Sequence, residues 1–483
     1  MNKRVWIFLG LCVLVSSALS FLMLTRGQTW PDDFAAYVMQ AKSLLAGDMQ
    51  GFIQHNTFTV QNSSYPPGPI AYPWGFPLLL APVYAIFGLN PLALKLVGVA
   101  FYAVFLVSFF FLARSRLSEL DALLLTGVFS VLPALLNAND LILSDVPFLA
   151  CSTLSLAMMQ ARAPLREKTW WGVASGASIF MAFFLRTNGV LLLAPLLLGF
   201  WQLCWPDWRA GLKQAAAPLL TFGALLALQF ALLPGGQESY FSHFSMFTLP
   251  RLWENVQYYA WLPGLVFERL PGGWMLFYLV ALLFLVISLL HHARRDAALH
   301  AYSLLTLALF ILWPERQGLR FVYPLLPMLL IGALDGMLIA IDFVRAGWQK
   351  TALGLARGYW GLILLAGLLV SSFAGIDNAV HGREINGPFD PYSKQMYAFL
   401  REKTPVESVI IFMRPRALRL FTDRDAFMTE RCEDLSKGDY VAIHEKVGDS
   451  GQIAPERVQS CNPDVRLEEV FNNKRFTVYK IEK

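Results

Sequence analysis

Long apolar runs separated by short polar stretches dominate the first three quarters of the chain. The run from residue 5 to residue 24 follows Lys3 and Arg4 and is as long as the roughly 20 residues that a helix needs to cross a membrane. We interpret it as an uncleaved anchor, because it exceeds the roughly 7 to 15 apolar residues of a cleaved signal peptide, which is the alternative. Further apolar runs bring the predicted total to about eleven spans: residues 91–113, 121–137, 146–161, 170–185, 189–205, 215–233, 274–290, 299–313, 321–344 and 359–376.

Charged residues are concentrated at the C-terminal end. Of the 73 Asp, Glu, Lys and Arg residues, 35 lie in residues 377–483, where 17 are basic and 18 acidic. Over the whole chain 56% of residues are hydrophobic and 15% charged, against roughly 25% charged in an ordinary soluble domain. This excludes a soluble enzyme and predicts an α-helical polytopic membrane domain, residues 1–376, followed by a small water-soluble domain, residues 377–483 (the tail). Because the basic excess belongs to the loops of the membrane domain, we expect no nucleic-acid partner.

The tail has the pattern of a mixed α/β domain. We expect helices over 392–401 and from Pro415, strands over 408–413 and 440–444, and a closing hairpin of 465–471 with 475–481. Cys432 and Cys461 both lie in the tail and are candidates for a disulfide in an oxidising compartment, with two unpaired thiols as the alternative.

Lys and Arg residues mark one side of the predicted membrane domain, which is the cytoplasmic side by the positive-inside rule. An odd number of spans then places the N-terminus in the cytoplasm and the tail outside. The outer side also carries two long loops, 25–90 (the first loop) and 234–273, and it is where we seek the function. The charges that mark the cytoplasmic side are Lys3, Arg4, Arg114, Arg116, Arg162, Arg166, Lys168, Arg209, Lys213, Arg294, Arg295, Arg345, Lys350 and Arg357.

Two adjacent carboxylates, Asp32 and Asp33, follow the first span by a few residues. After Pro31 they are suited to the first turn of a helix, where the helix dipole favours them, and this is the structural interpretation. The functional interpretation is a carboxylate base that takes a proton from an incoming hydroxyl or amine. The same pair could instead hold a divalent cation, so a metal cofactor stays open, with the base the preferred reading.

Further charged groups are expected at the same depth. Asp140 and Asp145 form a second acidic point, and helix capping explains one of them. Arg186 and Arg320 lie opposite these carboxylates and suit a lipid-linked phosphate, although Arg320, like Lys95, is also placed to extend toward lipid headgroups. The aromatic, proline-rich stretch 65–77 of the first loop suits the lining of a groove for a sugar or an isoprenoid chain.

These segments together resemble the GT-C glycosyltransferases, in the branch of the protein O-mannosyltransferases and the lipid A aminoarabinose transferase (family 39-like). The resemblance rests on Asp32-Asp33 with Tyr37 and the Leu44-Leu45-Ala46-Gly47-Asp48 run, and on the proline-aromatic run through Tyr84-Ala85-Ile86-Phe87-Gly88. It also rests on the recurring segments Ser144-Asp145-Val146-Pro147-Phe148, Arg186-Thr187-Asn188-Gly189 and Arg320-Phe321-Val322-Tyr323-Pro324.

The resemblance implies an inverting transfer of a sugar from a polyprenyl-phosphate donor to a glycan, lipid or protein acceptor, on the outer face of a bacterial inner membrane. Asp32 or Asp33 is then the base. Asp145, Arg186 and Arg320 position the sugar or neutralise the phosphate, and the tyrosines Tyr37, Tyr65 and Tyr72 belong to the donor groove. Tyr65 stands where many relatives carry a lysine, so phosphate binding has to depend on other residues, such as Arg186.

A transporter or flippase of lipid-linked sugars is the main alternative, since it also needs arginines and aromatic grooves on the outer side. It does not need a carboxylate pair directly after the first span, and the chain shows no internal repeat of the kind that transporters often carry.

Overall fold

The computed structural model describes residues 2–161, 165, 168–205, 207–235, 248–446 and 451–482. Arg162 and Arg166, and residues 236–247 of the second long loop, lie outside these ranges. The bundle helices are α1 (Lys3–Met23), α5 (Pro91–Arg114), α6 (Glu119–Val131), α7 (Pro133–Ala138), α8 (Asp145–Met159), α10 (Thr169–Leu185), η1 (Thr187–Leu192), α11 (Leu193–Cys204), α12 (Trp208–Leu232), α14 (Trp274–His291), α15 (Ala297–Leu312), η4 (Gly318–Leu325), α16 (Leu326–Asp342), η5 (Ala346–Trp348) and α17 (Gln349–His381).

All of the predicted apolar runs are helical, and the chain is a multi-pass membrane protein. Within the described ranges, seven helical segments are long and apolar enough to cross a membrane: α1, α5, η1 with α11, α12, α14, η4 with α16, and η5 with α17. Helices α8, α10 and α15 are apolar but shorter.

The run 121–137, expected as a single span, is instead two helices, α6 and α7. The break falls at Leu132, whose backbone is extended (φ −65°, ψ 117°), directly before Pro133. Proline lacks the N–H that would continue the helix and disfavours helical geometry in the residue before it. The turn lets α7 leave the direction of α6.

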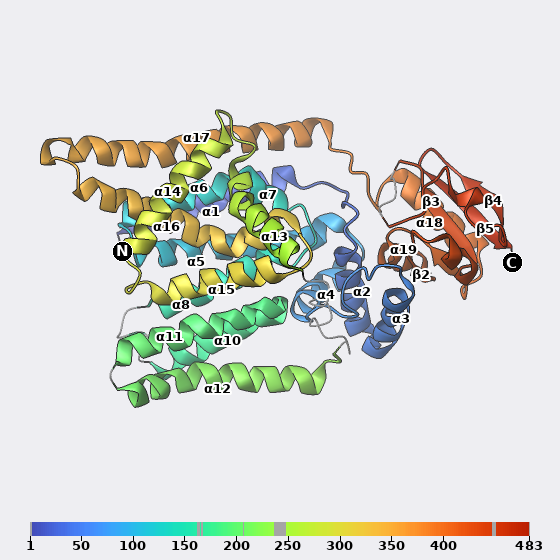
Figure 1. The fold of residues 1–483 in the computed structure, drawn as a ribbon, viewed down its shortest axis with the longest axis horizontal. Helices are drawn as coiled ribbons and strands as arrows, with labels where there is room; N and C mark the ends of the chain where they lie inside the picture. The colour runs from blue at the N-terminus through green and yellow to red at the C-terminus, as the bar shows by residue number, and fades with distance from the viewer. Residues whose placement is uncertain are drawn as a thin grey trace.

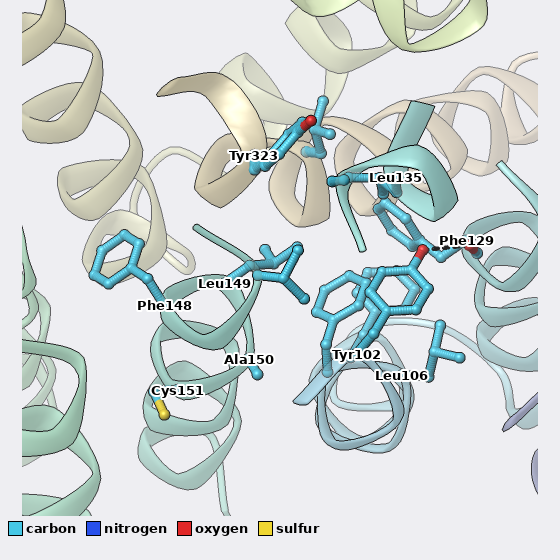
Figure 2. Close-up of a cluster of buried hydrophobic side chains, with 14 of the residues drawn as sticks. Tyr102, Leu106, Phe129, Leu135, Phe148, Leu149, Ala150, Cys151 and Tyr323 are labelled. Atoms are coloured by element: carbon cyan, nitrogen blue, oxygen red, sulfur yellow. Dashed lines mark hydrogen bonds between the residues drawn. The ribbon is translucent and has the colours of Figure 1, made fainter. Parts of the chain in front are cut away.

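Aromatic and aliphatic side chains fill the centre of the bundle (Figure 2). The ring of Phe129 on α6 packs edge-on against Phe105 and Phe109 of α5, with centroids 5.1 and 4.5 Å apart. The hydroxyl of Tyr102 donates a 2.6 Å hydrogen bond to the Phe129 carbonyl, so this buried polar group is satisfied inside the apolar core. Gly336 brings α16 against α14, because a Cβ there would lie 1.8 Å from the Phe284 carbonyl oxygen.

The first loop is folded into three helices, α2 (Asp33–Ala46), α3 (Met49–Asn62) and α4 (Gly75–Phe87), while the second long loop contains α13 (Leu249–Trp261) and η3 (Leu262–Phe267). Helix α2 ends at Gly47, whose positive φ of 69° suits glycine. The side chain of Gln40 on α2 binds both backbone groups of Tyr72, donating to its carbonyl at 2.9 Å and accepting from its N–H at 3.1 Å. This contact fixes the proline-rich stretch against α2.

The tail is a small α/β domain. Its sheet has the order β2-β1-β3-β5-β4, with parallel pairing among β2, β1 and β3 and antiparallel pairing of β5 with β3 and β4. The four predicted strands are confirmed; β2 was not predicted because, unlike the equally short β1, it does not lie in a run of β-branched residues. The elements are α18 (Pro391–Lys403), β1 (Val409–Ile411), α19 (Pro415–Thr422), β2 (Asp425–Phe427), η6 (Cys432–Lys437), β3 (Tyr440–His444), η7 (Val458–Ser460), β4 (Arg466–Asn472) and β5 (Phe476–Glu482).

Cys432 and Cys461 are joined as a disulfide, with their Cα atoms 5.2 Å apart. Helix α17 runs past residue 376 to His381 and is capped by Gly382, whose φ is 70°, so the expected boundary falls within the last turns of a helix. Figure 1 shows the N-terminus and the tail at opposite ends of the molecule, with α2, α3 and α4 between the bundle and the tail. We call the end of the bundle that faces the tail its tail end.

Candidate functional site

The adjacent carboxylates Asp32 and Asp33 lie at the start of α2, and their side chains have different neighbours. Asp33 is the first residue of α2 and faces the bundle. Asp32 precedes it and faces helix α19 of the tail. The expected pair is therefore two separate groups, each with its own electrostatic environment.

Asp33 is held by a tyrosine of the first loop and an arginine of the bundle. Its Oδ1 accepts a 2.7 Å hydrogen bond from the Tyr72 hydroxyl, and its Oδ2 accepts a 2.9 Å charged bond from Arg320, in η4. Burial alone would raise the pKa of Asp33, but the Arg320 charge and the Tyr72 hydroxyl outweigh it, so the pKa lies below its ordinary value. Asp33 is therefore an ionised anchor for Arg320.

A second ion pair lies close by. Asp145, the first residue of α8, pairs with Arg186, whose backbone is extended and which connects α10 to η1. The Arg186 guanidinium also lies over the ring of Phe321, 5.8 Å from its centroid. Because Phe321 directly follows Arg320, the two arginines belong to one region of the structure.

Tyr37 of α2 links the two pairs. Its hydroxyl is 2.9 Å from the Ser144 hydroxyl, beside Asp145, and its ring lies 4.7 Å from that of Tyr72. Burial raises the pKa of the Tyr37 hydroxyl, the Asp33 charge raises it further, and Arg186 opposes both. The site defined by these side chains, which we call the paired-charge site, consists of Asp33, Tyr37, Tyr72, Asp145, Arg186 and Arg320.

Asp32 lies outside that site, at the contact with the tail. Its Oδ1 accepts a 3.3 Å hydrogen bond from the Ala417 N–H, and its buried Oδ2 has no hydrogen-bond partner among the residues that the structure describes. Burial raises the pKa of Asp32 to about 6, against the opposing charges of Arg416 and Arg414. Such a carboxyl changes its ionisation near neutral pH.

Arg416 is the residue of this region that the sequence did not reveal. It is fully buried, although it belongs to the tail, and it reaches into the first loop, where it bonds to Asn56, Pro67 and Pro69. The sequence predicts only a helix from Pro415, which α19 confirms. No local signal distinguishes Arg416 from the neighbouring arginines, because its partners lie some 350 residues away in the chain.

The structure decides three expectations for other residues. Tyr65 does not join the paired-charge site, since its hydroxyl bonds to Glu315. Of the two outer acidic residues, Asp145 lies in the first turn of α8, whereas Asp140 accepts from Lys95 at 2.7 Å, from Arg383 at 2.7 Å and from the Thr25 N–H at 2.7 Å. Lys95 does not extend to lipid headgroups either, because its ammonium is buried and bonds to Asp140 and to the Thr25 carbonyl.

The geometry does not favour the interpretation of Asp32 and Asp33 as a divalent-cation site. Their carboxylates engage different partners, and the described ranges contain no group of three or more His, Cys, Asp or Glu side chains arranged to hold a metal ion. We therefore derive no step through a bound cation.

Comparison with known proteins identifies the fold. No family model matches the chain, and no curated protein matches it by sequence. Among solved structures, ArnT from Cupriavidus metallidurans bound to undecaprenyl phosphate is similar over 99% of this chain and 98% of its own, with a TM-score of 0.56 and 13% identity. The oligosaccharyltransferase of Archaeoglobus fulgidus, tethered to an acceptor peptide, matches over 92% of this chain and 70% of its own, with a TM-score of 0.56 and 11% identity.

The chain has the GT-C fold. A second structure of the Archaeoglobus protein, AglB, in complex with an inhibitory peptide and dolichol-phosphate, matches with a TM-score of 0.54 and 11% identity. At these identities the likeness concerns the backbone arrangement, so the roles of residues in this chain have to be argued from its own side chains.

Proposed function

We propose that the protein is a membrane glycosyltransferase that moves a sugar from a polyprenyl-phosphate donor to an acceptor on the outer face of the membrane, with inversion at the anomeric carbon. The observation that carries the proposal is the paired-charge site itself. Two arginines and two carboxylates from four distant segments converge there with two tyrosines, at the tail end of the bundle. Charged groups at membrane depth are costly, and the two arginines of this site stay partly exposed, so a ligand can reach them.

The donor phosphate is assigned to Arg186 and Arg320. Their side chains remain 21% and 22% exposed although each pairs with a carboxylate. A guanidinium carries five N–H donors, so each arginine keeps donors for phosphate oxygens after binding its carboxylate. Neutralising the phosphate stabilises it as a leaving group. The lipid-phosphate complexes of ArnT and AglB support this class of donor.

Asp32 is the better base of the two first-loop carboxylates. Both oxygens of Asp33 accept hydrogen bonds from cationic or hydroxyl donors and its pKa is lowered, whereas Oδ2 of Asp32 accepts no hydrogen bond from the described residues and the pKa of Asp32 is about 6. In the proposed step the acceptor oxygen or nitrogen attacks the anomeric carbon and gives its proton to Asp32. The bond between that carbon and the phosphate oxygen breaks, and polyprenyl phosphate leaves with the electron pair.

The proposed setting is a bacterial inner membrane with the N-terminus in the cytoplasm and the tail outside. The charge bias of the short connections supports this orientation. The disulfide of the tail also supports an oxidising, extracytoplasmic compartment.

Mass spectrometry of polyprenyl-phosphate sugars tests the proposal. Cells lacking the protein are complemented with the wild type, with the double variant Asp32→Asn/Asp33→Asn, or with Asp48→Asn as a matched control. Asp48 belongs to the same loop but only caps α3, accepting from the Gly51 N–H at 3.0 Å, a role that asparagine also fills.

We expect one phosphosugar to accumulate in the deletion strain, and to be cleared by the wild type and the control but not by the double variant. Clearance by all three would contradict carboxylate catalysis and favour transport. A lipid pool that the deletion leaves unchanged would refute the donor assignment.

A further inference from the structure

Arg416 is an arginine without exposed surface at the contact between two parts of the chain. It lies at the start of α19 in the tail, and its side chain is 0% exposed. A buried guanidinium is costly unless its donors are satisfied. Its position therefore needs partners, and those partners identify what it holds.

The partners that the structure gives Arg416 all belong to the first loop. Nε donates to Asn56 Oδ1 at 2.9 Å, Nη1 to the Pro67 carbonyl at 3.1 Å and Nη2 to the Pro69 carbonyl at 2.6 Å. Nε also lies 3.9 Å from Asp32 Oδ2, and the guanidinium carbon lies 5.6 Å from the centre of the Tyr72 ring. One side chain of the tail thus touches the base, the proline-rich stretch and a tyrosine of the paired-charge site.

Arg424 provides an internal comparison. It is also buried and also donates from all three guanidinium nitrogens, but its acceptors are Thr422, Arg401 and Thr404, all within the tail. Arg424 therefore holds the tail together, whereas Arg416 holds the tail to the first loop.

The contact with Asp32 is reciprocal. The Asp32 carboxylate accepts from the Ala417 N–H in the first turn of α19, while Arg416 of the same turn reaches past it into the loop. The charged and titratable groups that face Asp32 are Arg416, Arg414, Asp33 and Tyr397. Three of these four belong to the tail, Arg414 and Arg416 at the start of α19 and Tyr397 on α18, so the tail controls much of the electrostatic environment of Asp32.

We propose that the tail completes the catalytic site, with Arg416 as a positioning residue that holds the Asp32 carboxylate and the 67–69 backbone in their working geometry. The proposal rests on the proposed function, in which Asp32 is the base. It makes the tail part of the transferase itself rather than a separate module that only captures the acceptor.

Lysine cannot replace Arg416 in this role. The planar fork of the guanidinium reaches an amide oxygen and two carbonyls in fixed directions, whereas an ammonium is a compact point charge. An Arg416→Lys variant keeps the positive charge near Asp32 but loses most of the fork, so it separates charge from geometry. An Arg416→Gln variant loses both.

The test measures kcat/KM for sugar transfer against pH with the full-length protein, comparing Arg416→Lys, Arg416→Gln and the control Arg424→Lys. We expect both Arg416 variants to lose activity by about 10- to 100-fold, the scale for small displacements of catalytic groups. The acid limb should move to higher pH in Arg416→Gln only, because Arg416 lowers the pKa of Asp32. Arg424→Lys should leave both kcat/KM per folded molecule and the acid limb of the pH profile unchanged.

Hydrogen exchange of residues 65–72 gives a second readout that does not depend on turnover. Exchange there should accelerate in Arg416→Lys and not in Arg424→Lys. Wild-type activity and wild-type exchange in both Arg416 variants would overturn the inference. An Arg424→Lys variant with the same loss of activity and the same faster exchange would also overturn it, because Arg416 would then only stabilise the tail. If Arg416→Gln does not fold, Arg416→Lys still decides. A wild type that transfers no sugar refutes the proposed function instead.

Discussion

Two groups of buried charges lie toward the tail end of the bundle, and they differ in how fully their hydrogen bonds are satisfied. In the first, which we call the locked cluster, the buried pair of Lys95 and Asp140 is joined by Thr25, and the partly exposed Arg383 pairs with Asp140 from outside. The Lys95 ammonium has three donors, and Asp140 at 2.7 Å with the carbonyls of Thr25 at 2.9 Å and Gly27 at 2.5 Å uses them all. Its side chain is 0% exposed.

The paired-charge site is less closed. Arg320 bonds to Asp33 and Gln317, yet its side chain keeps 22% exposure, and Asp33 keeps 18%. The comparison teaches that a buried charge is not by itself a sign of function. A saturated pair holds helices in place, whereas a pair with remaining donors and some access can bind a ligand.

The largest effect is expected from breaking the locked cluster. Asp140→Asn leaves the Lys95 charge buried without its partner, and we expect a loss of about 3–5 kcal/mol in the free energy of unfolding. Asp145→Asn should cost less stability, because Arg186 is partly exposed. Chemical unfolding in detergent measures both. Equal losses in the two variants would remove the distinction between the clusters.

Removal of Arg320 should act on the reaction instead. Arg320→Gln is expected to lower kcat/KM for sugar transfer by about 100- to 1000-fold, the usual range when one donor to a developing charge is lost. Arg383→Gln is the matched control, since it removes an arginine that also pairs with a carboxylate, Asp140. An equal loss of activity in both variants would show that the effect is structural.

The pH dependence should report Asp32 rather than Asp33. Because burial raises the pKa of Asp32 to about 6, the group is protonated below that pH and cannot accept a proton there. We expect kcat/KM to fall about tenfold per pH unit below 6. Asp33, whose pKa is lowered, stays ionised through this range. A profile that is flat from pH 7 down to pH 4.5 would exclude Asp32 as the base.

The smallest effects are expected from two tyrosines of the same loop. Tyr72→Phe removes a hydrogen bond to Asp33 and should lower kcat/KM by about 3- to 10-fold, in line with about 1 kcal/mol for one hydrogen bond. Tyr65→Phe should change it by less than about 2-fold, because its hydroxyl bonds to Glu315 instead. Steady-state kinetics of the two variants distinguishes them, and a larger loss in Tyr65→Phe would restore Tyr65 to the donor site.

Local pattern was enough for much of the fold. Hydropathy identified the helical runs, and the strand predicted over residues 440–444 matched strand β3 to the residue. Hydropathy did not reveal the break at Pro133 between α6 and α7, because the apolar composition continues across the break. Strand β2 was not predicted either, because its three residues include no β-branched side chain.

For the candidate site, the sequence by itself determined which residues are expensive to bury: Asp32, Asp33, Asp145, Arg186 and Arg320 all stand in or beside apolar runs. Only the tertiary structure decided which charge meets which. Asp33 and Arg320 are 287 residues apart, and Arg416 is 360 residues from Asn56. Periodicity acts over a few residues, whereas these contacts depend on how separate helices pack, so no local pattern could assign Lys95 to a locked cluster or Arg416 to the first loop.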